Sequence, residues 1–329
     1  MLFFSTLIFG IFLTVSSYSW FSVWMGLEIN LLSILPLMVD SNNAFPSESA
    51  LKYFISQVVA SIFLMFSLIL IMKMQELIFL NSPFYLNILL ESALLTKMGA
   101  APFHFWFPEV MDGLNWMMNL ILMTIQKIAP MIILMYIKNN MFYFSIIIVL
   151  SAMISGLMGL NQLSLRKIMA YSSINHLAWM LSALLYSNML WLIYFSIYMI
   201  MTISIVLIFN NFNTYYTKQL YNICEINKSM TILITFLFFS LGGIPPFLGF
   251  LPKWFVIMSL TENLQFFLSF MLICFTLIVF SFYLRLILLP LMYTKNEMNT
   301  YKLLMYPNMY MFQLIMIFSL PISLLIFLI

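Results

Sequence analysis

The chain has 329 residues, of which 64% are hydrophobic and only 7% are charged, whereas an ordinary soluble domain has roughly 25% charged residues. So few charges cannot cover the surface of a water-soluble globule of this size, which excludes a soluble fold. The net charge of +3 comes without a basic tail or a long run of like charges, so nucleic acid is excluded as a partner.

The sequence predicts an all-α, polytopic membrane protein. A helix needs about 20 apolar residues to cross the hydrocarbon core of a bilayer, so this length allows about eleven spans with short connections. No ten-residue segments alternate between apolar and polar residues, as the strands of a membrane barrel would. The first segment stays apolar to Trp20 without a basic start or a cleavage signature, so it is a span and not a signal peptide.

Polar clusters and helix-breaking residues divide the chain into eleven predicted transmembrane helices. Two of them, at 84–112 and 230–258, contain an interruption, and a polar loop is expected at 213–228. Pro36 and the polar residues after it end the second helix. In chain order the predicted spans are 2–20, 22–38, 49–73, 84–112, 115–137, 142–160, 167–186, 189–211, 230–258, 264–289 and 308–328.

The basic residues of the loops and helix ends are distributed unequally between the two sides of the membrane. If the first helix starts on side A, that side holds most of them, and the positive-inside rule then makes side A the non-translocated side, the matrix in a mitochondrion. Side B holds Lys73 and Lys138. Side A holds Lys52, Arg166, Lys167, Lys218, Lys228, Arg285, Lys295 and Lys302.

One motif occurs twice, 144 positions apart. The segments 99–108 and 243–252 both read G-x-x-P-F-x-x-x-x-P. Each proline removes a backbone donor and frees the carbonyl four residues earlier, including those of Met98 and Gly242, so both helices are expected to be broken inside the membrane. Paired broken helices in two halves of a chain indicate a transport path. The alternative is that a short Gly-Pro motif recurs by chance.

The motif divides the predicted helices into two repeats of five. The first repeat covers 1–137, the second covers 138–290, and 291–329 adds a loop and a C-terminal helix. Because five is an odd number, successive repeats enter the membrane from opposite sides. This is the inverted-repeat architecture of antiporter-like transporters.

Four charged residues lie where spans should have none: Glu28, Lys97, Lys127 and Lys253. A charge at the bilayer centre costs roughly 2.5 to 3.5 kcal/mol, so such residues face the interior and either pair or serve a transport path. Burial favours neutral lysine, whereas a nearby carboxylate favours the charged form, so moving Glu28 relative to a lysine would switch its proton occupancy. The alternative is a set of static ion pairs that hold helices together.

The two histidines and Glu91 are weaker candidates. His104 lies inside the first break, where it either caps a free carbonyl or relays protons. His176 lies in the polar segment Ser172–His176, where it is either a proton relay or a satisfied interior side chain. Glu91 precedes Lys97 by one and two-thirds helical turns, so it points elsewhere and has no assigned role.

No metal or redox site is predicted. Cys224 and Cys274 are 50 positions apart and lack paired spacing, and two histidines cannot supply the axial ligands of two haems. The 30 methionines have no accompanying histidine cluster, so they are interpreted as packing residues. Any redox chemistry must therefore take place outside this chain.

Several blocks of the sequence resemble the family of second subunits of mitochondrial NADH:ubiquinone oxidoreductase, respiratory complex I. The resemblance covers nearly the whole chain and fits the short animal form that lacks three N-terminal helices of bacterial members. The bias toward Phe, Met and Ile points to an insect. The blocks are W-M-G-L-E-I-N at 24–30, K-M-G-A-A-P-F-H-F-W-F-P at 97–108, Q-K-I-A-P at 126–130, 159–167, 171–176 and 241–254.

The resemblance implies a multi-pass, proton-pumping subunit of the mitochondrial inner membrane. In that family Glu28 corresponds to a glutamate paired with the broken-helix lysine, here Lys97. Lys127 corresponds to a relay lysine, and Lys253 faces the exit path or a neighbouring antiporter-like subunit. Small membrane-arm subunits, accessory subunits and lipids such as cardiolipin are further implied partners. NADH, FMN, iron-sulfur clusters and ubiquinone would bind other subunits, so this chain carries no cofactor.

The resulting hypothesis is that NADH oxidation and quinone reduction elsewhere shift the pairing of Glu28 with Lys97 and drive protons along Lys97, Lys127 and Lys253. A stand-alone cation/proton antiporter would use the same charges, and ion transport by the isolated chain would favour it. A purely structural membrane-arm subunit would instead make neutralising substitutions change stability alone.

Overall fold

A computed structural model describes residues 2–39, 43–77, 84–137, 140–226 and 228–292. Apart from short turns and one isolated β-bridge, these residues are helical, as the all-α prediction requires. The chain forms two compact units, Met1–Ser151 and Ala152–Ile329. The predicted helix at 308–328 lies outside the described residues, so the total of eleven spans stays a prediction, as does the division into two five-helix repeats.

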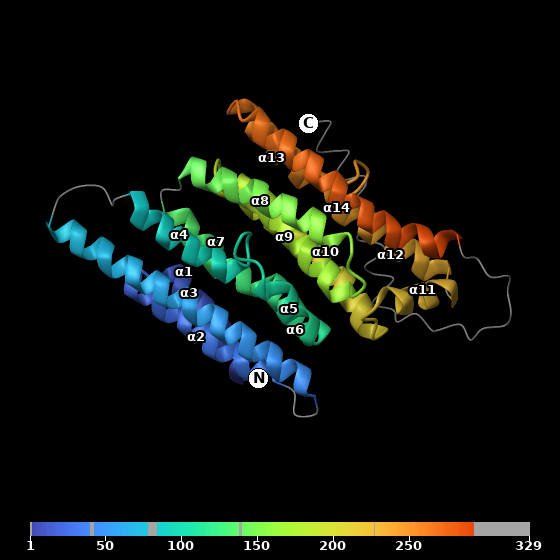
Figure 1. The fold of residues 1–329 in the computed structure, drawn as a ribbon, viewed down its shortest axis with the longest axis horizontal. Helices are drawn as coiled ribbons and strands as arrows, with labels where there is room; N and C mark the ends of the chain where they lie inside the picture. Colours follow the sequence, from blue (N-terminus) through green and yellow to red (C-terminus); the bar gives the residue numbers. More distant parts are fainter. Residues whose placement is uncertain (1, 40–42, 78–83, 138–139, 227, 293–329) are drawn as a thin grey trace. The chain divides into compact units, whose positions relative to one another are not determined.

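The first unit is built around α7, which contacts α1, α2, α4 and α6. The helices α1, α2 and α3 lie side by side in Figure 1, and α3 also packs on α4 and α5. The helices of this unit are α1 (Leu2–Ser16), α2 (Trp20–Met38), α3 (Ala44–Leu77), α4 (Phe84–Met98), α5 (Trp106–Gly113), α6 (Trp116–Met123) and α7 (Ile125–Tyr136).

The second unit is built around α9 (Leu165–Leu184), which contacts α10, α13 and α14 and buries nearly all of its residues. The helix α8 (Met141–Gly159) begins in the first unit and ends in the second. The remaining helices are α10 (Asn188–Asn211), α11 (Thr217–Ile226), α12 (Lys228–Gly242), α13 (Phe250–Glu262) and α14 (Phe266–Met292).

The outer surface carries the side chains expected of a protein surrounded by lipid. On α3, Ile55, Ile62 and Phe66 are each more than half exposed. Among the described residues, six helices are long and apolar enough to cross a membrane. Water would penalise so much exposed apolar surface, whereas hydrocarbon does not, so the composition and the fold agree on a membrane protein.

One local prediction was wrong, and one predicted span contains an interruption that was not predicted. The segment predicted as a polar loop contains α11, because Leu220 and Cys224 lie one turn apart on one face and are buried in the second unit, where α11 packs on α12 and α14. The span predicted at 115–137 is found as one segment long and apolar enough to cross a membrane, Trp116–Tyr136, but it is interrupted at Thr124 between α6 and α7. The side-chain hydroxyl of Thr124 donates to the carbonyl of Leu120 at 2.7 Å, a local bond that competes with the backbone ladder.

Candidate functional site

The predicted break in the first unit separates α4 from α5. Gly99 has a φ of +75°, in the left-handed region that glycine adopts without steric cost. The amide of Ala100 donates to the carbonyl of Leu95 at 3.1 Å, and the amide of Gly99 donates to that of Thr96 at 3.2 Å. A left-handed glycine with this pair of bonds forms a helix C-cap, so α4 ends at this glycine and α5 begins only at Trp106.

The break in the second unit, between α12 and α13, repeats this geometry 144 positions later. Gly243 has a φ of +78°, and the amide of Ile244 donates to the carbonyl of Phe239 at 3.3 Å. The bond from Phe103 to Ala100, at 2.8 Å, recurs from Phe247 to Ile244, at 2.9 Å. Chance recurrence of a motif with four fixed residues would not repeat the hydrogen bonds as well, so the two breaks are one structural device used twice.

Side chains donate hydrogen bonds to backbone carbonyls at the ends of both interrupted helices. In the first unit, the indole of Trp106 donates to the carbonyl of Thr96 at 3.0 Å. In the second unit, the Lys253 ammonium donates to the carbonyl of Gly242 at 2.8 Å and to that of Leu241 at 3.3 Å. Gly242 is one of the carbonyls that the sequence predicted to be free, and the buried lysine takes the place of its helical donor.

Lys97 and Glu28 lie in the first unit without a direct ion pair between them in the described residues. Lys97 is buried near the end of α4, and the charge of Glu28 acts on it through space. One carboxylate oxygen of Glu28 is buried and has no hydrogen-bond partner within the described ranges. The direct contact implied by the family resemblance is therefore not formed in this structure.

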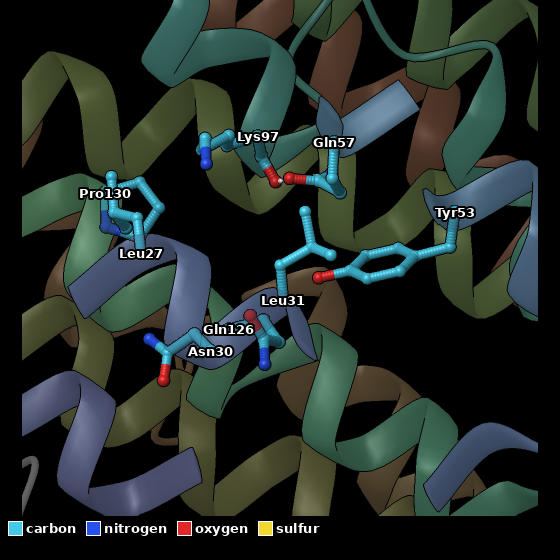
Figure 2. A pocket seen from close by; sticks show the side chains of 8 residues that line it. All are labelled: Leu27, Asn30, Leu31, Tyr53, Gln57, Lys97, Gln126 and Pro130. Carbon is cyan, nitrogen blue, oxygen red and sulfur yellow. Dashed lines mark hydrogen bonds between the residues drawn. The ribbon is translucent and has the colours of Figure 1, made fainter. Parts of the chain in front are cut away.

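A small polar cavity adjoins Lys97, as Figure 2 shows. The cavity has a volume of about 10 Å³, which is close to what one water molecule needs. The polar side chains that line it come from α2, α3, α4 and α7 and are Asn30, Tyr53, Gln57, Lys97 and Gln126. Tyr53 and Gln57 were not predicted as site residues, although their separation by four residues places them on one face of α3.

Lys127 lies at the start of α7, three residues after the division at Thr124. Its side chain is only 1% exposed, and its ammonium lies 5.3 Å from the centre of the Phe107 ring. The negative face of an aromatic ring attracts a cation, so the ring offers this lysine electrostatic compensation away from water. Phe107 belongs to α5, directly after the first break, so the break and Lys127 share one site.

The two histidines have different environments. The Nδ1 of His104 donates to the carbonyl of Pro102 at 3.3 Å, because a carbonyl oxygen can only accept. This bond supports the capping interpretation of His104. The Nδ1 of His176 lies 2.9 Å from the hydroxyl of Tyr194, and the His176 ring lies 5.0 Å from that of Tyr198. His176 therefore belongs to a buried cluster that α9 and α10 build together.

The candidate residues fall into two groups. Glu28, Lys97, His104 and Lys127 belong to the first unit. The second unit holds His176 and Lys253, and α9 connects them, because Trp179 follows His176 on that helix and its ring lies 5.9 Å from the Lys253 ammonium. Neither Trp179 nor Phe107 was predicted, since an aromatic residue in an apolar span carries no signal of its role.

The described residues contain no group of three or more His, Cys, Asp or Glu side chains that could hold a metal ion. Cys224 and Cys274, the two cysteines of the chain, are both free thiols.

Comparison with known proteins gives a consistent family assignment. Residues 17–281 match the family described as NADH:quinone oxidoreductase/Mrp antiporter, transmembrane. NADH-ubiquinone oxidoreductase chain 2 of Anopheles gambiae is 52% identical over 88% of this chain and 86% of its own length. The chain 2 protein of Aedes aegypti is 48% identical over 91% and 89%. In solved structures, a chain of respiratory complex I from Thermus thermophilus has a similar fold, with a TM-score of 0.84, 21% identity and coverage of 97% of this chain and 76% of that chain.

Proposed function

The chain belongs to the NADH:quinone oxidoreductase/Mrp antiporter family of membrane proteins, and from this premise we propose that it is a proton-translocating membrane subunit of respiratory complex I. The observation that carries the proposal is the 52% identity to an NADH-ubiquinone oxidoreductase chain 2 over 88% of the chain. The subunit works in the mitochondrial inner membrane as part of an H⁺-translocating NADH:ubiquinone oxidoreductase. A stand-alone antiporter is the less favoured alternative.

In this proposal, NADH oxidation and ubiquinone reduction take place in other subunits, where NADH, FMN, the iron-sulfur clusters and ubiquinone bind. Their energy reaches this chain as a change in the separation of Glu28 and Lys97. Approach of the carboxylate favours the charged lysine, and its withdrawal favours release of the proton.

The proton released by Lys97 then passes to Lys127 and on to Lys253. The polar cavity beside Lys97 extends to Gln126, the residue directly before Lys127, and has room for one water molecule that would carry the proton. His104 is a candidate relay in the first unit, which holds Lys97 and Lys127. His176 is a candidate relay in the second unit, which holds Lys253. We further propose that Lys253 faces the exit path or a neighbouring antiporter-like subunit.

The proposed partners are the other membrane-arm subunits. They include a neighbouring antiporter-like subunit, small core subunits, accessory subunits and bound lipids such as cardiolipin. The exposed apolar residues of α3 are of the kind that lipid or another transmembrane helix would cover.

Replacing Glu28 by glutamine tests the function. Because glutamine keeps the size of the side chain but removes its charge, Glu28→Gln is expected to depress coupled quinone reductase activity severalfold while the complex still assembles. Assembly is measured by native electrophoresis, and proton uptake per electron is measured in sealed vesicles. Glu48→Gln is the matched control, since Glu48 is an exposed glutamate that pairs with Lys52 at 3.1 Å.

Normal proton-to-electron stoichiometry in both Glu28→Gln and a neutral Lys127 variant would overturn the proposed mechanism. A change in the thermal stability of the complex without a change in stoichiometry would favour a purely structural subunit. Co-purification of the chain with a large NADH-oxidising assembly is expected, whereas ion transport by the isolated chain would favour the stand-alone antiporter.

A further inference from the structure

Glu91 is a fully buried carboxylate that the proposed path does not use. It lies on α4 and is 0% exposed. One carboxylate oxygen accepts a hydrogen bond from the backbone amide of Asn140 at 3.3 Å. The other oxygen is buried and has no hydrogen-bond partner among the described residues. A buried carboxylate with one unsatisfied oxygen is costly, so its presence calls for a physical explanation.

Two opposing effects act on the charge of Glu91. Burial away from water penalises the ionised form. The amide of Asn140 precedes α8 and is one of the unpaired donors at the start of that helix, where the helix dipole favours a negative charge. The single hydrogen bond from Asn140 therefore compensates only one of the two carboxylate oxygens of Glu91.

Few charged groups face Glu91 from the elements around it. Tyr143 of α8 is a titratable side chain on which the charge of Glu91 acts. From α3 and α7, which pack on α4, no charged side chain within the described residues acts on Glu91. The carboxyl group is therefore not locked into a static ion pair there, and its oxygen without a hydrogen bond is available to bind a proton.

The position of Glu91 relates it to the translocated side of the membrane. It lies seven residues after the start of α4, about 10 Å along the helix at 1.5 Å per residue. Its partner Asn140 lies in the connection between α7 and α8, which the distribution of basic residues assigns to side B, as it does the start of α4. Lys97, six residues further along α4, lies about 9 Å deeper. Glu91 thus stands between Lys97 and side B.

We propose that Glu91 is a further proton-carrying residue, which binds and releases a proton at the side B end of the first unit. The inference rests on the proposed function. A hydronium ion arriving from the lysine side gives its proton to the free carboxylate oxygen, forming one O–H bond and leaving water. Release to side B reverses the step and restores the hydrogen-bonded carboxylate, with no change in oxidation state.

The variant Glu91→Gln, measured in the assembled complex, distinguishes proton transfer by Glu91 from a role limited to accepting the hydrogen bond of the Asn140 amide. The glutamine carbonyl still accepts the bond from Asn140, but the side chain cannot exchange a proton. Coupled turnover is expected to fall about threefold, less than the roughly 10²–10⁴-fold contribution of a positioned proton-transfer group because water gives a slower bypass. The dependence of turnover on the pH of side B is expected to lose one titration step in Glu91→Gln and to keep it in Glu91→Asp.

Glu28→Gln is measured in parallel. If Glu91→Gln matches the wild type in turnover and pH profile while Glu28→Gln is impaired, the role of Glu91 is refuted and the proposed function stands. If both variants pump normally, the role of Glu91 is refuted, and the neutral Lys127 variant then decides whether the proposed mechanism fails as well. If Glu91→Gln does not assemble, the pH profiles of turnover are compared between Glu91→Asp and Glu91→Asn, whose side chains are equal in length. Equal pH profiles of these two variants would overturn the proposal.

Discussion

Substituting Lys127 by methionine is expected to reduce coupled proton transport by at least about tenfold, within reach of the roughly 10²–10⁴-fold effect of a positioned proton-transfer group. Methionine fills a similar volume, so the buried site beside Phe107 keeps its packing but loses its only means of holding a proton. The measurement is proton translocation per NADH oxidised in vesicles that contain the assembled complex.

Lys52→Met serves as the control, because Lys52 is half-exposed on α3, pairs with Glu48 and Glu109 at 3.1 Å, and has no place in the proposed path. Lys127→Arg tests whether the site needs a side chain that can release its proton or only a positive charge. Arginine stays charged and cannot release a proton at working pH, so it is expected to fail as well. Full pumping by Lys127→Arg would show that charge alone is sufficient and would contradict a relay role.

Replacing Gly249 by alanine is expected to cause the largest loss of stability. An added Cβ would overlap the backbone carbonyl oxygen of Ser240, which cannot rotate away as a side chain would. The start of α13 and the end of α12 would have to separate, at a cost at or above the roughly 1–3 kcal/mol of an overpacked core. The yield of assembled complex and its midpoint of thermal inactivation measure the effect.

Gly156→Ala is the matched control in the same unit. A Cβ at Gly156 would lie 3.3 Å from a side-chain methyl of Ile278, which needs to give by only a few tenths of an ångström. We therefore expect near-normal yield from Gly156→Ala and a marked loss from Gly249→Ala. Equal yields from the two variants would mean that the close approach of α12 and α13 is unimportant for the fold.

The sequence alone determined the features that depend on local chemistry. Scarce charge leaves no way to solvate a surface, so the chain had to be an all-helical membrane protein. Glycine and proline act on the backbone of their own helix turn, so the positions of both breaks followed from the motif, and left-handed Gly99 and Gly243 occupy them. An ionisable residue in an apolar span is conspicuous by itself, and Lys97, Lys127 and Lys253 are all buried.

Only the tertiary structure decided which groups meet, because contacts between distant segments leave no trace in local composition. The apolar face of α11 could be recognised only from its packing on α12 and α14. Glu91 had no partner in its own sequence neighbourhood, since the amide that binds it comes from Asn140, 49 residues later. Separation of Lys97 from Glu28 likewise depends on how α2 and α4 are placed. Local chemistry fixes where a helix breaks and where a charge is buried, whereas packing fixes what each charge touches.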